Sequence, residues 1–464
     1  MQKQSAKNKA GVFRIIIVGC GKVGHTLTEQ LAREGHDITI IDTNERVIRD
    51  IADVIDVMGV CGNGASLRVL EDAGLKDADL VIAVTGSDEL NLLCCTVAKK
   101  IRGNIAAIAR VRNPDYSEEL AYLRQQLGLS MIVNPELEAA HEIARLLASP
   151  QALEISSFAK GHAELVRFKI PESNVLAGKS LMQLSPIFAF GFLVCAVERA
   201  GSVVIPDGSF TLQAGDDITI IVDSRDVHSI FDAIDMRSRA VRSCMIVGGG
   251  RTSYYLAKLL MAQKMEVKLI EPRRERCEEL TALLPGALIV CADGGEEAVL
   301  REEGIEDAEA FAALTGIDEE NILLTLFANR IDGLKTVTKI NRITFSDVID
   351  ELDLGSVVYP KHITSELICT YVRACQNTIG SNVETMYHMF DGRVEAVSFH
   401  VEKGAPVAGI PLMKLGKKDN LLIACINRGG RIFFPRGQDA IEPGDSVIIV
   451  TTHTGLTDIG DILL

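Results

Sequence analysis

One strand and glycine-turn pattern occurs twice in this chain, about 230 residues apart. The first copy spans residues 14–24 and reads RIIIVGCGKVG, and the second spans residues 244–253 and reads CMIVGGGRTS. In each copy a run of apolar residues ends at a glycine, and a helical pattern follows. This order is typical of the first βαβ unit of a doubly wound parallel sheet. The repeat therefore predicts two such sheets in one chain.

The first copy has a complete phosphate-binding motif. Gly19 permits the tight turn, Gly21 lets the backbone approach a pyrophosphate, and Gly24 lets the next helix pack on the strand. We predict that helix over Thr26–Glu34, and the amides at its start attract anionic oxygens. A second strand ends at Asp42, close to the spacing of about 20 residues at which an acidic residue binds a ribose diol. An acid there disfavours NADP, because it repels a 2′-phosphate.

Further candidates follow the later strands of the first copy. Ligands of open parallel sheets lie beyond the carboxyl ends of the strands. Those ends carry Gly62, Asn63, Thr85, Gly86 and Arg110. The small residues leave room for adenine, the threonine can donate to a phosphate or a ribose, and the arginine can balance phosphate charge. Each residue alone is more often a turn or surface residue, but their joint placement favours a pocket.

The second copy departs from this motif. Its first two glycines are retained and Glu271 follows the next strand, but Ser253 replaces the third glycine. Because the serine Cβ hinders close packing of the helix, two interpretations stay open: a weaker site, or a retained fold with an empty site. Lys22 in the first loop corresponds to Arg251 in the second. A cation there either reaches additional phosphates or is a solvated charge at a helix start.

The repeat continues beyond the glycine turns. Three later motifs return at nearly the same offset: 60–64 as 290–294, 85–91 as 315–321, and 108–111 as 337–340. After each unit the sequence changes to short strands with glycine and proline turns, which is typical of a small α+β module. We predict a flexible tail (1–13), a Rossmann-like sheet (14–135), a connecting helix (136–158), a small module (159–236), a second Rossmann-like sheet (242–360), a second connecting helix (361–385) and a second small module (386–464).

Charge and composition argue against several classes of function. With a net charge of −15 over 464 residues, the chain is not expected to bind nucleic acid or an anionic membrane surface. No apolar run approaches the ~18 residues of a transmembrane helix, so we expect no direct membrane insertion. The eleven cysteines have no metal-ligand spacing, and we interpret them as buried thiols with no metal site. The functional alternative for these cysteines is redox sensing.

Local catalytic motifs are missing from the sequence. It has no Walker loop, no GxSxG and no compelling histidine and carboxylate pair. Without such groups, a nucleotide bound at the glycine turn has no evident chemistry to perform. The doubled layout therefore favours ligand sensing over hydride transfer.

Taken together, these motifs resemble the TrkA family, the cytosolic regulatory subunits of bacterial Trk-type potassium uptake systems, which are built from two RCK units. The resemblance covers Arg14 to Thr452, and its most specific feature is the doubled layout. In that family each Rossmann-like sheet is an RCK N-lobe and each small module is an RCK C-lobe. The matching motifs of the first half are residues 17–24, Asp42, 62–64, 77–85, Asn91, 109–114, 206–208 and 215–217.

The resemblance implies a regulatory protein and not an enzyme. Its implied ligands are NAD(H), ATP and ADP. Its implied partner is a membrane potassium transporter, which a homo-oligomeric ring, a tetramer or a dimer of dimers, gates from the cytoplasmic face of the cell membrane. The implied binding residues of the first copy are Gly19, Cys20, Gly21, Lys22, Val23, Gly24, Asp42, Gly62, Asn63, Thr85, Gly86 and Arg110. Those of the second copy are Gly248, Gly249, Gly250, Arg251, Thr252, Glu271, Ala292, Asp293, Thr315, Gly316 and Lys339.

Two alternatives stay open from the sequence. One is an NAD-dependent oxidoreductase whose second unit is a degenerate duplicate, which the missing catalytic groups oppose. The other is a nucleotide sensor for a different cation channel or antiporter, because the same unit serves several transporters.

Overall fold

The structure is a computed structural model of the chain. It describes residues 12–117, 119–158, 161–184, 191–236, 241–341, 349, 352, 354–377, 382–390, 392–453, 455–456 and 458–464. The predicted tail lies outside the described residues except for Val12 and Phe13.

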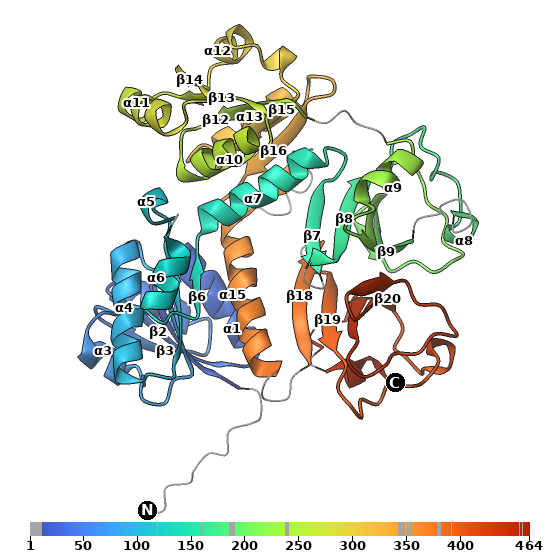
Figure 1. Cartoon of the computed structure of the whole chain (residues 1–464), viewed down its shortest axis with the longest axis horizontal. Coiled ribbons are helices and arrows are strands. Elements are labelled where there is room, and N and C mark those ends of the chain that lie inside the picture. The colour runs from blue at the N-terminus through green and yellow to red at the C-terminus, as the bar shows by residue number, and fades with distance from the viewer. Residues whose placement is uncertain are drawn as a thin grey trace, which may run out of the picture. The chain divides into compact units, whose positions relative to one another are not determined.

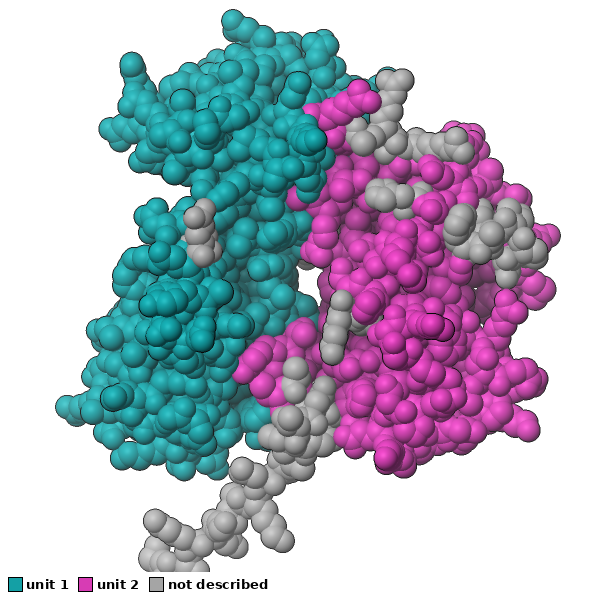
Figure 2. Space-filling view, in the orientation of Figure 1, with its two compact units in different colours: residues 1–143, 243–369 teal, residues 144–242, 370–464 magenta. Residues whose placement is uncertain are grey.

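The chain forms two compact units, residues 1–143 with 243–369 and residues 144–242 with 370–464 (Figure 2). The first unit contains both Rossmann-like sheets, and the second contains both small modules. Each unit therefore combines parts of both sequence repeats.

The first N-lobe is a six-stranded parallel sheet in the order β3-β2-β1-β4-β5-β6. Val18, the last residue of β1, pairs with Ile41 of β2 and Ala83 of β4. The strand order reverses between β1 and β4, so the carboxyl ends of these strands surround the switch point. The strands are β1 (Arg14–Val18), β2 (Asp37–Asp42), β3 (Met58–Cys61), β4 (Leu80–Ala83), β5 (Ala106–Arg110) and β6 (Met131–Val133). The helices are α1 (Lys22–Arg33), α2 (Glu45–Ala52), α3 (Leu67–Asp72), α4 (Asp88–Ile101), α5 (Pro114–Ser117), α6 (Leu120–Gln126) and α7 (Pro135–Ala148).

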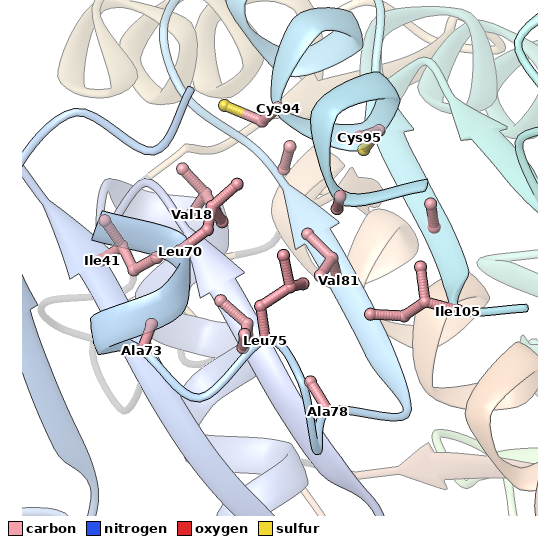
Figure 3. Close-up of a cluster of buried hydrophobic side chains, with 14 of the residues drawn as sticks. Val18, Ile41, Leu70, Ala73, Leu75, Ala78, Val81, Cys94, Cys95 and Ile105 are labelled. Carbon is pink, nitrogen blue, oxygen red and sulfur yellow. The ribbon is translucent and has the colours of Figure 1, made fainter. Parts of the chain in front are cut away.

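Apolar side chains on one face of this sheet form a dry core (Figure 3). Val18 and Val81 of the strands meet Leu70 of α3 and Cys94 and Cys95 of α4. Each of these side chains is at most 2% exposed. Burial of such runs on both faces explains why the strand sequences are apolar throughout instead of alternating. This core fixes the strand ends at which the predicted ligand residues lie.

The cysteines divide into core and surface residues. Burial raises the pKa of the Cys94 thiol to about 12, as expected for an inert core thiol. Cys61 and Cys291 are exposed, however, and Cys375 is half-buried. The interpretation that all the cysteines are buried is therefore wrong at these three positions. Cys61 and Cys291 are the last residues of strands at the edges of the two parallel sheets, where burial ends.

The second N-lobe repeats the first in the order β14-β13-β12-β15-β16-β17, again all parallel. Its strands are β12 (Ser243–Val247), β13 (Glu266–Glu271), β14 (Leu288–Cys291), β15 (Ala310–Ala313), β16 (Lys335–Lys339) and β17 (Ser356–Val358). Its helices are α10 (Arg251–Ala262), α11 (Arg274–Leu283), α12 (Glu297–Glu302), η2 (Ile305–Asp307), α13 (Asp318–Ala328) and α15 (Pro360–Asn377). The predicted duplication of a doubly wound sheet is confirmed.

Two helix boundaries differ from the prediction. Helix α1 begins at Lys22 and not at Thr26, because Gly21 takes an extended conformation and serves as the N-cap. Helix α15 begins at Pro360, where a missing N–H costs nothing, and it ends at Asn377, inside the predicted connecting segment 361–385. The earlier start of α1 brings its first free amides into the glycine loop.

The second unit consists of two antiparallel sheets with the same topology, β10-β9-β11-β8-β7 and β18-β19-β22-β20-β21. The first C-lobe comprises β7 (Glu154–Phe158), β8 (Ala163–Lys169), α8 (Leu181–Leu184), β9 (Phe192–Arg199), β10 (Ser202–Val204), β11 (Asp217–Asp223) and α9 (Val227–Ala233). The second comprises β18 (Val383–Met389), β19 (Val394–His400), η3 (Leu412–Lys414), β20 (Leu421–Arg428), β21 (Arg431–Phe433), β22 (Ser446–Thr451) and η4 (Ile459–Ile462). Strands β7 and β18 begin inside the segments 136–158 and 361–385, which the sequence predicts as connecting helices.

The two C-lobes share one core. Phe158 and Cys195 of the first lobe cluster with Phe390 and Cys425 of the second. The guanidinium of Arg167 lies 4.5 Å from the centre of the Phe390 ring. A joint core of this kind explains why the small modules form one compact unit in spite of their separation in the sequence.

Candidate functional site

The first glycine loop closes around the end of β1. Gly19 has a φ of +97°, and a Cβ there would lie 2.8 Å from backbone atoms of Thr85. A Cβ at Gly24 would lie 1.9 Å from the carbonyl oxygen of Gly19, whereas a Cβ at Gly21 would meet open space. The first turn of α1 contains no acidic side chain. The loop therefore presents unbalanced N-terminal amides to the space above it, as an anion site requires.

Asp42 lies at the end of β2, next to this loop. Its Oδ2 accepts the amide of Cys20 over 2.8 Å, and its Oδ1 accepts the amide of Asn44 over 2.9 Å. An ionised carboxylate has about four acceptor positions, so each oxygen retains a lone pair after these bonds. Burial, together with the charge of Asp42, raises the pKa of the Cys20 thiol to about 12. The Cys20 thiol therefore stays protonated and uncharged, and Asp42 accepts the backbone amide of Cys20.

A hydrogen-bond network joins the ends of β4 and β5. The side-chain oxygen of Asn91 accepts both the amide and the hydroxyl of Thr85 over 2.7 Å. The amide group of Asn91 donates to the carbonyl of Arg110 over 2.9 Å. The expectation that the Thr85 hydroxyl donates to a ligand is therefore wrong, because its proton already bonds within the protein. Thr85 shapes the site through its backbone.

Arginine side chains follow β5. The Arg110 guanidinium donates to the carbonyl of Thr85, and its Nε is buried without a hydrogen-bond partner among the described residues. Burial, followed by the charge of Arg112, lowers the pKa of Arg110 to about 10, so it stays charged at neutral pH. Arg112 lies 3.4 Å from Asp88 and donates to the carbonyl of Gly86 over 2.5 Å. The backbone thus holds two cations beside the cavity.

These parts enclose a cavity of about 680 Å³ at the switch point of the first sheet. Its volume is within the range of small-molecule sites. Three lining residues come from the second N-lobe: Asn341, Pro360 and Lys361. Burial, followed by the charge of Lys22, lowers the pKa of Lys361, and both lysines line this cavity. The cavity is therefore built by both lobes of the first unit.

Glu136 also lines the cavity, at the start of α7. Its Oε2 is buried without a hydrogen-bond partner among the described residues. Burial raises the pKa of Glu136, against the opposing charges of Arg112, Arg110 and Arg251. The charge of Arg251, from the second glycine loop, also helps to lower the pKa of Arg110. The second loop therefore acts electrostatically on the first site.

The acidic residue of the second copy is more heavily bonded than Asp42. Glu271 is 4% exposed; its Oε2 accepts the amide of Gly249 over 2.7 Å, and its Oε1 accepts the Arg273 side chain over 2.7 Å. Burial alone would raise the pKa of Glu271, but the Arg273 side chain and the backbone amides lower it overall. Arg276 donates to the carbonyl of Gly249 over 2.7 Å. Two arginines thus bond to Glu271 and to a carbonyl of the second glycine loop.

The other predicted residues of the second copy mainly support its backbone. Thr315 donates its amide to Asn321, as Thr85 does to Asn91, but its hydroxyl donates to the carbonyl of Ile317. Lys339 donates to the carbonyl of Leu314 over 2.9 Å, and burial lowers its pKa to about 8. Asp293 caps the amide of Gly295. The remaining predicted residues here are Gly248, Gly250, Thr252, Ala292 and Gly316.

Comparison with known proteins gives these sites a context. The TrkA-N domain family matches residues 15–135 and 244–360, and the TrkA-C domain family matches residues 165–235 and 396–464. The chain belongs to the TrkA family. It is 30% identical over 458 residues to the Trk system potassium uptake protein TrkA homolog 1 of Methanosarcina mazei, which covers 96% of this chain and 99% of that protein. It is 31% identical over 440 residues to the Trk system potassium uptake protein TrkA of Haemophilus influenzae, at 94% and 95% coverage.

Solved structures share the fold of this TrkA-family chain. The GsuK channel bound to NAD has a TM-score of 0.61 at 17% identity, over 96% of this chain and 77% of that one. The GsuK RCK domain has the same TM-score, over 96% and 93% of the two chains. The tandem arrangement of Rossmann-like RCK N-lobes and α+β C-lobes is therefore shown by both sequence and structure.

Most of the predicted residues of the first TrkA-N domain line one cavity. They are Gly19, Gly21, Lys22, Val23, Asp42, Gly62, Asn63, Thr85, Gly86 and Arg110. Cys20 and Gly24 are not among the lining residues. Cys20 donates its amide to Asp42, and Gly24 packs against the carbonyl of Gly19. The sequence analysis missed Arg112, Glu136, Asn341 and Lys361 as lining residues. Arg112 lies in a motif of the family resemblance, but no local signal marks Asn341 and Lys361 of the second N-lobe.

Two classes of site are not found in the part of the chain that the structure describes. No group of three or more His, Cys, Asp or Glu side chains there could hold a metal ion. No helix there is long and apolar enough to cross a membrane.

Proposed function

We propose that this chain is the regulatory subunit of a Trk-type potassium uptake system and that its first TrkA-N domain binds an adenine nucleotide as a signal. The observation that carries this proposal is the cavity at the switch point of the first sheet, where the glycine loop, Asp42 and a group of cations meet. The curated relatives at about 30% identity are named potassium uptake proteins, and they match over nearly the full length.

The adenosine half of the ligand lies between Asp42 and the turn after β3. The free lone pairs of Asp42 accept the two ribose hydroxyls. A Cβ at Gly62 would come within 2.6 Å of Val69, and one at Gly64 within 2.2 Å of Val18. The backbone after β3 therefore stays close to the sheet, which leaves the space above it for a flat base.

The phosphates lie on the glycine loop. The amides at the start of α1 bind the first phosphate groups, and Lys22, Arg110, Arg112 and Lys361 neutralise the remaining charge. All three proposed ligands, NAD(H), ATP and ADP, present an adenosine diol and at least two phosphates to such a site. The acid at the ribose excludes a 2′-phosphate, so NADP is the poorer ligand.

The second TrkA-N domain gives this ligand a way to act. Asn341 and Lys361 face the same cavity from the second lobe, so a bound nucleotide contacts both lobes of the first unit. A ligand shifts a conformational equilibrium only through its difference in affinity between the two states. A tenfold difference supplies about 1.4 kcal/mol per site, and a homo-oligomeric ring, a tetramer or a dimer of dimers, multiplies it. The ring would pass this free energy to the membrane subunit from the cytoplasmic face.

The second glycine loop is the poorer site. Arg273 and Arg276 already bond to Glu271 and to the loop, and a ligand would have to displace them. We propose that Gly248 to Thr252 and Glu271 bind nucleotide weakly, and that Arg251 serves the first cavity.

Reconstitution tests the function directly. The full chain is combined with a Trk-type membrane subunit in proteoliposomes, and potassium flux is measured against ATP, ADP, NADH and no nucleotide. We expect flux to depend on both the chain and the nucleotide, and the Asp42→Ala chain to bind the membrane subunit without responding to nucleotide. Nucleotide binding without any association with the membrane subunit would refute the assigned partner. Steady turnover of NADH with a substrate would instead support the oxidoreductase alternative.

A further inference from the structure

Two cysteines of the second TrkA-N domain meet beside Glu271. Cys291 ends β14 and pairs in the sheet with Glu271 at the end of β13. Cys277 lies on α11, six residues after Glu271, and its thiol donates to the carbonyl of that residue over 3.1 Å. The thiol of Cys291 approaches the carbonyl of Pro272 at 4.0 Å. The two sulfur atoms therefore lie against the carbonyl groups of two consecutive residues, Glu271 and Pro272.

The two thiols differ in their access to solvent. Cys291 is exposed, whereas Cys277 is 6% exposed. Helix α11 packs against β14, so the cysteines are presented by two neighbouring elements of one lobe (Figure 1). An exposed thiol with a buried second thiol next to it is the arrangement of an attacking and a resolving cysteine.

The first TrkA-N domain lacks this arrangement. Cys61 occupies the position of Cys291 and is also exposed, but Ile48 stands where the second copy has Cys277. The Ile48 side chain fills this space closely, because a Cβ at Gly59 would lie 2.2 Å from its Cγ2. The first TrkA-N domain therefore serves as an internal control, because it has the exposed cysteine but not the second, buried one.

We propose that Cys277 and Cys291 are a redox modification site, which forms a reversible intramolecular disulfide by exchange with a low-molecular-weight disulfide such as oxidised glutathione. The thiolate of Cys291 attacks one sulfur of the small disulfide and releases one small thiolate, which takes up a proton. The Cys277 thiol then loses its proton to water and attacks the Cys291 sulfur, and the second small thiol leaves. Two protein thiols are oxidised while one small disulfide is reduced to two thiols.

The order of the two steps follows from exposure. Burial, followed by the influence of the neighbouring Cys291 thiol, raises the pKa of Cys277 to about 11. Only the thiolate is an effective nucleophile, so the second step accelerates as the pH rises toward that value. The bond links α11 to the end of β14 and removes the Cys277 hydrogen bond to the Glu271 carbonyl. Oxidation therefore acts on the segment that carries the acidic residue of the second site.

Mass spectrometry tests the proposal without any assumption about nucleotide binding. The folded full chain is incubated with oxidised glutathione, quenched in acid, alkylated under denaturing conditions and digested with trypsin. Both cysteines lie in the tryptic fragment 277–301, and Cys61 lies in the fragment 50–68. We expect fragment 277–301 without alkylation and about 2 Da lighter than its reduced form. Fragment 50–68 should carry a stable glutathione adduct.

Variants separate the two steps. Cys277→Ser should retain the glutathione adduct on Cys291, Cys291→Ser should leave Cys277 open to alkylation, and Cys61→Ser should form the disulfide as the wild type does. A wild-type fragment 277–301 that accumulates the glutathione adduct and never loses the 2 Da, even near pH 9, would overturn the proposal. This mass is measured on the wild-type chain, so it tests whether the disulfide forms even where a variant is unstable.

Discussion

Replacement of Asp42 by alanine tests the first site most directly. Asp42 is the acceptor for the ribose diol, and each of its oxygens already accepts one backbone amide, from Cys20 and Asn44. One lone pair per oxygen is left for a ribose hydroxyl. A hydrogen bond to a charged group contributes about 1.5–3 kcal/mol, so two such bonds at the lower limit give about 3 kcal/mol. We expect Asp42→Ala to weaken ADP binding by about 100-fold.

A ligand that lacks the hydroxyls makes this test specific. Dideoxy-ADP removes the same two hydrogen bonds from the other side, so wild type should bind it about 100-fold more weakly than ADP. The Asp42→Ala chain should bind both ligands equally. Isothermal titration calorimetry gives all four affinities, and thermal melting without ligand shows whether the loop stays folded after two amides lose their acceptor.

The second copy supplies the matched control. Glu271 occupies the equivalent position but is paired with Arg273, so Glu271→Ala should change ADP affinity by less than about threefold. Equal losses from the two substitutions would refute the ranking of the two sites. An Asp42→Ala chain that still distinguishes ADP from dideoxy-ADP would refute the role of Asp42 itself.

Three further substitutions test other features of the first unit. Lys361→Gln should weaken ADP binding about three- to tenfold and leave adenosine binding unchanged in calorimetry, because this half-exposed lysine reaches the phosphates from the second lobe. Burial lowers the pKa of Lys335 from 10.5 to about 7, so the unfolded chain binds more protons between these values and stability should rise with pH across them. Lys335→Met should abolish this slope in pH-dependent melting and stabilise the fold at pH 6 by up to about 5 kcal/mol. Ser253→Ala should leave the melting temperature unchanged or raise it, since the buried Ser253 hydroxyl has no hydrogen-bond partner among the described residues.

The sequence was sufficient for the parallel sheets, because their strands are buried on both faces and read as continuous apolar runs. The apolar run before Gly19, which the sequence predicts as a strand, is β1 (Arg14–Val18). Strand β7 was missed because it is a short edge strand, and its sequence, EISSF, is half polar. Hydrophobic periodicity gives little signal at such an edge.

The residues of the candidate site also fall into two groups, those that the sequence predicts and those that it does not. Gly19 and Asp42 were recognised because backbone geometry and ribose chemistry demand those residue types at that spacing. Lys361 and Asn341 were not, since they reach the cavity only after the two N-lobes have packed together, and no local pattern records that contact. The role of Thr85 was misread because its hydroxyl bonds to Asn91, a partner that the sequence does not place.

Divergence between the two copies is concentrated in side chains, since the backbone networks are retained. Asn91 and Asn321 hold equivalent strand ends in the same way, through bonds to Thr85 and Thr315. At the ribose position, by contrast, Asn44 of the first copy offers only its amide to the acid, whereas Arg273 adds a charged side chain. The missing third glycine at Ser253 is therefore the smaller difference, because the fold has accommodated it. The arginine that occupies the acceptor is what separates a ligand site from a structural repeat.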